Sequence, residues 1–210
     1  MGRTSDAEQR LMDAVLELVW TGSYGATTID LICEKAGVKK GSFYYYFDSK
    51  TDLTAAALES CWLKTYRPQM DAIYSSSVDP LARLKAHAEH AYQEQAQALK
   101  EFGHVLGCPL FTLGNEISTQ EQKLRDVIEK ILNTQHRYVE SALREASAKG
   151  DIVCPDPGFM AKALFLYWEG ALAEARIKND LSLLKNLWPS MQKLLGLTPA
   201  PPAKARRKAA

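Results

Sequence analysis

The sequence predicts an all-α protein built from a small N-terminal helical domain and a larger helical domain after it. Apolar residues recur at helical spacing in successive stretches of the 210-residue chain, and breaks that contain glycine or proline separate these stretches. No stretch shows the alternation of apolar and polar residues that is typical of a half-buried strand. We expect the first domain to span residues 1–58 and the second to span residues 59–197. Residues 198–210 are expected to form a disordered basic tail.

Composition indicates a soluble protein of the cytoplasm. Hydrophobic residues make up 46% of the chain and charged residues 24%, as in ordinary globular proteins. The four cysteines are scattered, without a CxxC pair or a secretory leader, which favours free thiols in a reducing compartment. No apolar run approaches the roughly 20 residues that a membrane span needs, so no membrane association is expected.

The first helix is expected to begin at Ser5 or Asp6 and to end at Gly22, with residues 1–4 as a mobile arm before it. Apolar residues at helical spacing give this helix one buried face. They are Leu11, Ala14, Val15, Leu18 and Val19.

Two short helices with a tight turn between them are expected next. Thr27 or Thr28 can cap the first, because a side-chain oxygen there accepts an otherwise unpaired backbone N–H. Gly37 suits the end of that helix, where a left-handed residue is common. The second helix is expected over about Lys40–Phe47, with Phe43 facing inward. Such a pair is a helix-turn-helix, whose second helix enters the major groove of DNA.

The outward face of that second helix carries hydrogen-bond donors and flat aromatic rings, which suit phosphate oxygens and base edges. Three consecutive tyrosines on a helix point in three directions, so they cannot all be buried. The residues of this face are Lys39, Lys40, Ser42, Tyr44, Tyr45 and Tyr46. Residues 1–50 hold six Lys and Arg against seven Asp and Glu, a net charge of −1. Binding should therefore depend on a few placed contacts and on dimerisation more than on bulk attraction to DNA.

The stretch GVKKGSFYYYFDSKTDL at residues 37–53 closely resembles the signature of the TetR family of bacterial transcriptional repressors, and the resemblance extends from Asp6 to about Leu58. It implies a homodimer that places one recognition helix from each subunit in successive major grooves of a near-palindromic double-stranded operator. It also implies that a small molecule, bound in the larger domain, releases the DNA. Activation in place of repression is left open.

The same resemblance implies the roles of individual residues on the DNA side. The expected contacts with base edges or the groove are Lys39, Lys40, Ser42 and Tyr45. The expected phosphate contacts are Thr28, Tyr44, Tyr46 and Lys50. Gly41 is expected to let the backbone approach the DNA closely at the start of the helix.

The larger domain should begin with a long helix over about Lys50–Tyr74, which links the two halves of the chain. Three glycines and Pro109 make residues 101–118 an expected irregular segment. Further helices are expected at residues 81–101, 119–149, 157–178 and 181–195.

An effector site is implied among the middle helices, and an apolar or aromatic small molecule is the expected ligand. Aromatic and apolar side chains in this part of the chain are the candidates for its lining. They are Trp62, Tyr66, Phe102, Leu106, Phe111, Tyr138, Phe165 and Trp168. The alternative is that these side chains are ordinary core.

Cys108 is a further ligand-binding candidate. Its setting, GCPLFTLGNEIS, resembles a stretch of TetR-type regulators that sense acrylate-like compounds or reactive electrophiles, and the resemblance extends to WEGALAEARIK in the penultimate helix. A thiol near Arg176 or His104 would have a lowered pKa and would react with an electrophile or oxidant. The alternative is a buried cysteine that packs as a small apolar residue.

The last two helices, at residues 157–178 and 181–195, are apolar over more than one stripe. The resemblance implies that these two helices from each subunit form a four-helix homodimer interface. A thick core within a monomer is the alternative.

Neither an enzyme nor a metal or cofactor site is indicated. The sequence lacks a Gly-rich phosphate loop, a GxSxG elbow and recognisably paired catalytic carboxylates. His87, His90 and Glu94 share a helical face, but no further ligand for a metal is identifiable. A helical protein-interaction module without DNA binding would explain the last helices, yet it gives residues 39–46 no purpose.

Overall fold

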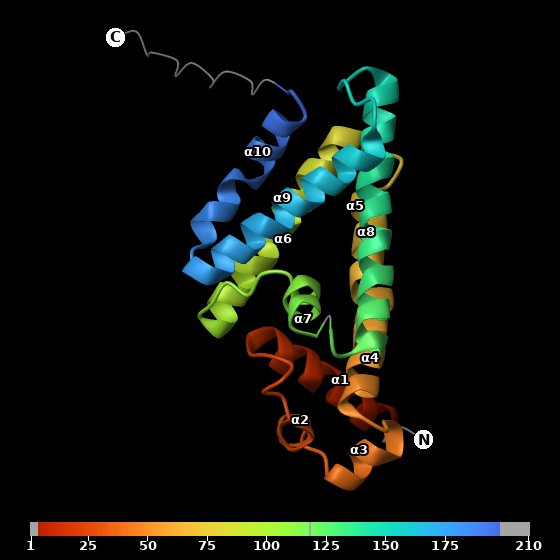
Figure 1. Ribbon diagram of the computed structural model, residues 1–210, viewed down its shortest axis with the longest axis vertical. Helices are drawn as coiled ribbons and strands as arrows, with labels where there is room; N and C mark the ends of the chain where they lie inside the picture. The colour runs from red at the N-terminus through yellow and green to blue at the C-terminus, as the bar shows by residue number, and fades with distance from the viewer. Residues whose placement is uncertain (1–3, 118, 198–210) are drawn as a thin grey trace, which may run out of the picture.

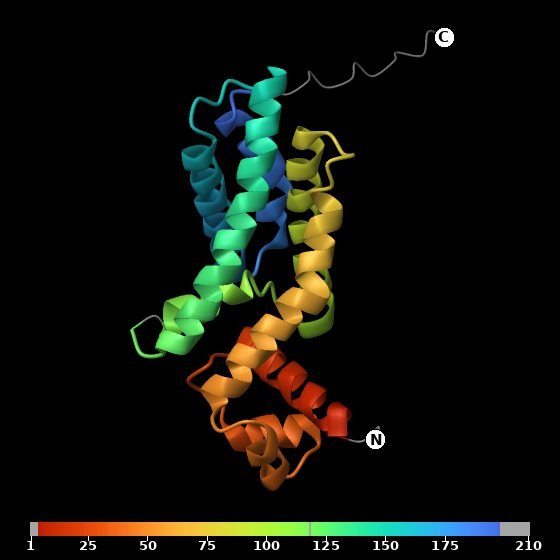
Figure 2. The same ribbon diagram turned by 90° about the vertical axis from the view of Figure 1, so that its right-hand side faces the viewer.

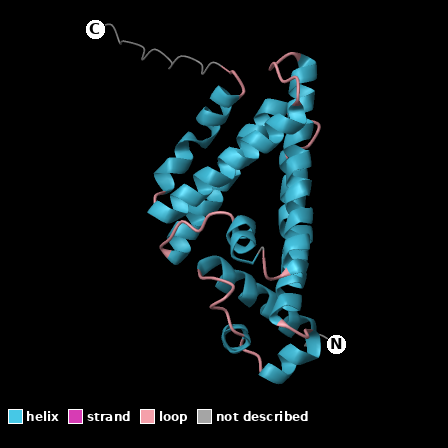
Figure 3. Ribbon diagram, viewed as in Figure 1, coloured by secondary structure: helices cyan, strands magenta, loops and turns pink. Residues whose placement is uncertain are grey.

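The computed structural model describes residues 4–117 and 119–197, and every regular element among them is a helix (Figure 3). The all-α prediction is therefore confirmed. Residues 1–3 of the expected arm and the expected tail at 198–210 lie outside the described residues. The elements in order are α1 (Thr4–Thr21), α2 (Ile29–Ala36), α3 (Lys40–Tyr46), α4 (Lys50–Cys61), the π-helix η1 (Trp62–Tyr66), α5 (Arg67–Ile73), α6 (Pro80–Phe102), α7 (Pro109–Ile117), α8 (Gln122–Lys149), α9 (Pro157–Lys178), the 3₁₀-helix η2 (Leu181–Asn186) and α10 (Leu187–Leu194).

The helix-turn-helix forms from local signals in the sequence. The Thr28 hydroxyl accepts the backbone N–H of Leu31 at 3.2 Å, which caps α2. Gly37 ends α2 with φ of 63°, a conformation that costs glycine little. Phe43 on α3 is fully buried, and Phe47, directly after α3, is 8% exposed. These two rings fix α3 to the small domain and leave its other face outside.

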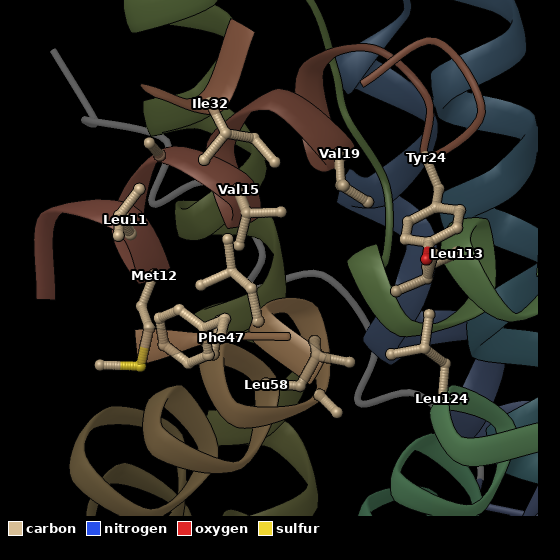
Figure 4. Close-up of a cluster of buried hydrophobic side chains, with 14 of the residues drawn as sticks. Leu11, Met12, Val15, Val19, Tyr24, Ile32, Phe47, Leu58, Leu113 and Leu124 are labelled. Atoms are coloured by element: carbon tan, nitrogen blue, oxygen red, sulfur yellow. The ribbon is translucent and has the colours of Figure 1, made fainter. Parts of the chain in front are cut away.

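One apolar cluster joins the small domain to the larger one. Figure 4 shows Val15 of α1 and Phe47 in the same cluster as Leu113 of α7 and Leu124 of α8. Leu113 is 1% exposed and Leu124 is fully buried. The domain boundary near residue 58 stays a prediction, because this cluster crosses it. A shift of α7 or α8 must therefore be felt by α1 and α4.

The long helix from Lys50 is continuous, but it is not regular. The π-helix η1 separates α4 from α5, and Pro68 lies in the first turn of α5. Proline has no N–H to donate and clashes with the carbonyl four residues earlier, so a regular α-helical turn is disfavoured here. The wider π turn accommodates the ring, and such turns often occur at functional sites. Figure 2 shows this composite helix rising from the small domain into the larger one.

Three predictions for the second half need correction. The segment at residues 101–118 is not irregular throughout, because helix α7 begins at Pro109. Proline is tolerated at the first position of a helix, since an N–H group there would have no hydrogen-bond partner within the helix. The next helix begins at Gln122, three residues later than expected. The last segment is also not one α-helix: η2 precedes α10, which carries Pro189 in its first turn.

A second apolar cluster holds the larger domain together. It contains Leu84 of α6, Leu143 of α8, Leu164 of α9 and Leu187 of α10, each at most 1% exposed. In Figure 1, α6 and α9 cross the middle of this domain, with α8 along one side and α10 along the other. Helix α9 packs against both α8 and α10. Its opposite surface is consequently left for solvent or a partner.

Candidate functional site

The outward surface of α3 is open, as the tyrosine pattern predicts. The side chains of Tyr44 and Tyr45 are 53% and 74% exposed. Lys39, Lys40 and Gly41 at the start of α3 are also exposed, and the position where Gly41 would carry a Cβ has no neighbour within 4 Å. This end of α3 therefore presents cations, phenols and accessible backbone together.

Two residues of this surface already have partners. The Lys40 ammonium lies 2.8 Å from the Asp30 carboxylate of α2, and this hydrogen bond and charge raise the pKa of Lys40. Tyr46 is half-buried, and its ring meets that of Tyr45 edge-on at 4.8 Å between centroids. Both arrangements orient the side chains before any DNA is present.

Thr28 and Lys50, which were expected to contact phosphate, hold the small domain together in this structure. The Thr28 hydroxyl is occupied as the cap of α2. The Lys50 ammonium donates to the carbonyl oxygens of Tyr24 and Thr27 at 2.7 and 2.8 Å and lies 4.0 Å from the centre of the Tyr24 ring. Burial lowers the pKa of Lys50. Lys50 thus ties α4 to the α1–α2 loop, and any phosphate contact by it stays a prediction.

A cavity of about 360 Å³ lies where the two domains meet. Its walls come from α1, α4, η1, α6, α7, α8 and α9, and from Cys108 in the loop before α7. Five of the predicted candidates are among its lining residues: Trp62, Tyr66, Phe102, Cys108 and Trp168.

The four other candidates lie away from this cavity. Phe111 and Phe165 pack against each other, with ring centroids 6.0 Å apart. The Tyr138 hydroxyl donates to Asp71 on the outer side of α5. Leu106, within the loop before α7, is buried but does not line the cavity. For the three candidates on helices, the rotation of each helix about its axis, which the sequence does not reveal, decides that they do not face the cavity.

The cavity also has polar lining residues that were not predicted as ligand contacts. They include Glu17, His90, Glu94, Gln95, Glu101, Gln135 and Glu169. Glu169 is 6% exposed, although it carries a carboxylate. An acidic residue among the apolar side chains of α9 is the one signal that would have drawn attention to it.

Gln95 fixes the loop that carries Cys108. Its side-chain oxygen accepts the backbone N–H groups of Leu106 and Gly107 at 3.0 and 2.7 Å. The Trp20 indole of α1 donates to the Gly107 carbonyl at 3.0 Å. Gly107 has φ of 65°, and a Cβ there would lie 3.3 Å from the Leu172 carbonyl, so only glycine suits this turn. The cavity loop is therefore bonded directly to a helix of the small domain.

The environment of Cys108 contradicts the expected lowering of its pKa. Desolvation and the neighbouring Glu169 carboxylate raise the pKa of Cys108 well above its usual value, and the thiol is hydrogen-bonded to Glu169. The Arg176 guanidinium instead donates to the Leu106 carbonyl at 2.6 Å and to Thr112 at 3.1 Å. His104 is exposed. The cation that was expected to activate the thiol is thus engaged elsewhere.

Helix α7 spans the distance between cavity and small domain. Its first residue follows Cys108, and near its other end the Glu116 carboxylate accepts the backbone N–H groups of Tyr24 and Gly25 at 2.8 and 2.6 Å. The α1–α2 loop is held by Glu116 on one side and by Lys50 on the other. This loop leads directly into the helix-turn-helix.

Of the three residues weighed as a metal site, His87 packs among aromatic side chains, whereas His90 and Glu94 line the cavity. The Tyr74 hydroxyl and His87 Nδ1 are 2.8 Å apart, and the imidazole lies against Trp168. Burial lowers the pKa of His87 to about 3. Within residues 4–117 and 119–197, no group of three or more His, Cys, Asp or Glu could hold a metal ion. Nor is any helix in those ranges both long and apolar enough to cross a membrane.

A helix-turn-helix joined to a helical domain with an internal cavity defines a DNA-binding transcriptional regulator. Residues 11–57 match the bacterial regulatory proteins of the tetR family, and residues 80–191 match the tetracyclin repressor-like C-terminal domain. The chain belongs to the TetR family, and it is a regulator and not an enzyme.

Relatives and solved structures agree with this assignment. The transcriptional regulator AcuR of Cereibacter sphaeroides is 32% identical over 82% of this chain and 77% of its own length. The transcriptional repressor NemR of Escherichia coli is 23% identical over 93% of this chain and 96% of its own. The crystal structure of a regulatory protein TetR from Rhodobacter sphaeroides superposes with a TM-score of 0.79 at 29% identity, covering 90% of this chain and 98% of that one.

Proposed function

We propose that the protein is a homodimeric repressor that binds a near-palindromic operator and releases it when a small molecule enters the cavity. The observation that carries this proposal is that helices next to the DNA-binding part also form the cavity wall. Leu16 and Trp20 of α1, and Leu58 and Cys61 of α4, line the cavity. Helix α1 packs directly against α2 and α3 of the helix-turn-helix, and α4 packs against α1. The repressor name of the relative NemR supports repression over activation. Such a protein acts in the cytoplasm, on the DNA of the nucleoid.

On the DNA side, α3 enters the major groove. Lys39, Lys40, Ser42 and Tyr45 meet base edges, while Tyr44 and Tyr46 contact phosphates and Gly41 permits close approach. The exposed rings and ammonium groups at the start of α3 support this arrangement. For Thr28 and Lys50, the partners described above favour a contribution through placement of α2 and α4, with phosphate contact secondary.

The homodimer forms through α9 and α10. Residues at alternating spacings of three and four along α9 form one small or apolar stripe, which is exposed except at the half-buried Ala163. This spacing suits helix-to-helix packing. The stripe consists of Phe159, Ala163, Leu166, Gly170, Ala173 and Ile177. Phe159, Leu166 and Ile177 are 69%, 65% and 84% exposed, which is unusual for such large apolar side chains. A partner's α9 and α10 would cover them.

The protein releases the operator because DNA and ligand favour two different arrangements of the same helices. A ligand in the cavity contacts α1, α4 and the Cys108 loop, and α7 carries a shift of that loop to the α1–α2 loop through Glu116. The spacing of the two recognition helices in the dimer then no longer matches the operator. Because DNA and ligand bias one equilibrium, each weakens the other, typically by about 1–3 kcal/mol.

Fluorescence anisotropy with DNA from the protein's own upstream region tests the proposal. Moderate salt and non-specific competitor DNA suppress binding by charge alone. We expect saturable binding at two subunits per site and its loss in Tyr44→Ala. If that DNA gives no specific binding, selection from random DNA follows, and failure there as well would favour a helical interaction protein.

A thiol sensor at Cys108 is the alternative form of effector response. Its place in the cavity wall supports it, whereas the raised pKa of the thiol does not. Cys108→Ser decides between the two. Release of operator by an electrophile that persists unchanged in Cys108→Ser would exclude the thiol mechanism.

A further inference from the structure

Glu169 of α9 is a buried carboxylate with spare hydrogen-bonding capacity at the cavity. It is 6% exposed, and its Oε2 atom has no hydrogen-bond partner among the residues that the structure describes. The Cys108 thiol is its hydrogen-bonded neighbour. A buried acceptor without a donor is costly, and native structures rarely leave one unless a ligand or a water supplies the donor. The carboxylate lines the cavity, so a ligand there can reach it.

The remaining polar lining of the cavity is mainly acidic, with three further glutamates beside His90, Gln95 and Gln135. Glu17, Glu94 and Glu101 also lie on its wall, and Glu94 accepts the Tyr66 hydroxyl. Among the described residues that line the cavity there is no lysine or arginine. Such a wall attracts a cation and opposes an anion, and the low-dielectric surroundings strengthen both effects.

The rest of the wall suits an apolar body and the face of a cation. Three indole rings, those of Trp20, Trp62 and Trp168, line the same cavity, together with the Phe102 ring. Trp168 directly precedes Glu169 on α9. Aromatic faces attract ammonium groups, most strongly where water is excluded.

We propose that the effector is an organic cation, an apolar or aromatic amine whose ammonium group donates a hydrogen bond to Glu169. This inference rests on the proposed role of the cavity as the effector site and names the ligand class. Arg176 is the nearest candidate for recognising an anion instead, but its guanidinium is bonded to Leu106 and Thr112, and it does not line the cavity. Charge-assisted bonds to a buried carboxylate give strong discrimination between a ligand that donates and one that does not.

Three probes of matched shape test the proposal: naphthylethylamine, naphthylethanol and naphthylacetate. Isothermal titration of the full-length protein at neutral pH measures the affinity of each. We expect the amine to bind at least about tenfold more tightly than the alcohol and the acid, and Glu169→Gln to remove that preference while retaining the alcohol's affinity. Glu101→Gln, an exposed carboxylate on the same wall, is the matched control and should retain most of the preference.

Several outcomes would overturn the inference. The first is tightest binding of the acid, and the second is an amine preference that survives in Glu169→Gln. Ala91→Phe places a large side chain in the cavity and should abolish binding of all three probes. Undiminished binding in this variant is the third outcome that would overturn the inference. Thermal melting checks that each variant folds. If Glu169→Gln does not fold, the inference is judged by whether the wild-type protein binds the amine more tightly than the alcohol and the acid.

Failure of this inference is distinguishable from failure of the proposed function. Binding of the alcohol or acid in the cavity without preference for the amine rejects the cation and leaves a ligand-responsive repressor. Absence of binding by all three probes rejects the cation as well. The anisotropy assay with operator DNA then tests repression and release independently, with compounds outside this series.

Discussion

At the residue scale, two charged side chains occupy unusual positions, and each has a function that its surroundings explain. Lys40 is exposed on the recognition helix but is paired with Asp30 of α2. Glu169 is buried and lacks a full set of partners. Exposed ion pairs contribute little to stability, so the Lys40 pair matters for orientation. The buried carboxylate, in contrast, costs stability that ligand binding can recover.

Glu169 gives the protein a specific pH dependence. Its burial raises the carboxyl pKa from 4.5 to about 7, whereas Cys108 beside it has a raised pKa and stays protonated in this range. The folded protein holds the Glu169 proton to a higher pH than the unfolded chain does, so stability is lost as pH rises from about 4.5 to about 7. The Glu169→Gln variant has no carboxyl group to ionise here, so it should not lose stability in this way. Its unfolding free energy relative to that of the wild type should rise by up to roughly 3 kcal/mol across that pH range. Urea unfolding at several pH values measures this, and a constant difference would contradict it.

Lys40 should contribute to sequence preference more than to general affinity. Lys40→Ala is expected to weaken operator binding by about 1–3 kcal/mol and to reduce discrimination against a mutated operator, because a base-edge contact is lost. Lys35→Ala is the matched control, since Lys35 lies on α2 and pairs with Glu17 of α1. Anisotropy on wild-type and mutated operators measures both affinities. Equal losses of affinity for the wild-type and mutated operators would indicate that Lys40 contacts phosphate and not a base edge.

At the element scale, the π-helix η1 and helix α7 are the elements that connect the cavity to the small domain. The π turn places Trp62 and Tyr66 on the cavity wall within an otherwise continuous helix. Helix α7 links the Cys108 loop to the α1–α2 loop through Glu116. Neither element is evident from apolar periodicity. To predict the π turn, one would have to foresee how Pro68 distorts the helix before it. Helix α7 is hard to predict because it is short and contains Gly114.

Glu116 should protect the backbone of the α1–α2 loop. Its carboxylate accepts the N–H groups of Tyr24 and Gly25, so Glu116→Ala is expected to make both amides exchange with solvent at least about tenfold faster. The unfolding free energy should fall by about 1 kcal/mol, because the carboxylate is exposed and water partly replaces the bonds. Hydrogen exchange and urea unfolding measure these effects. Asn115→Ala, an exposed neighbour on α7, is the control, and equal exchange in the two variants would refute the role of Glu116.

At the scale of the whole molecule, sequence predicted local features and missed those that depend on how helices rotate against one another. The cap at Thr28, the turn at Gly37 and the inward Phe43 act within a few residues, and each is found as expected. The cavity draws residues from seven helices and a loop, so only five of nine candidates line it. Glu169 was missed for the same reason: only its packing reveals that a carboxylate is buried beside Cys108.

The assembly prediction concerns the exposed stripe of α9. Leu166→Glu places a charge in the centre of that stripe, where a partner's α9 would bury it without a counter-ion. We expect the dimer dissociation constant to rise by at least about a hundredfold in sedimentation velocity. Operator affinity should fall as well, because a monomer reads only one half-site.

Leu63→Glu is the matched control for this prediction. It introduces the same change at a leucine of η1 with comparable exposure, 55% against 65%, at a position outside the stripe. It should leave the dimer and operator binding intact. If both variants remain dimeric, α9 does not form the interface, and its apolar stripe serves another partner. If both become monomeric, the interface extends to η1 and is not confined to the last two helices.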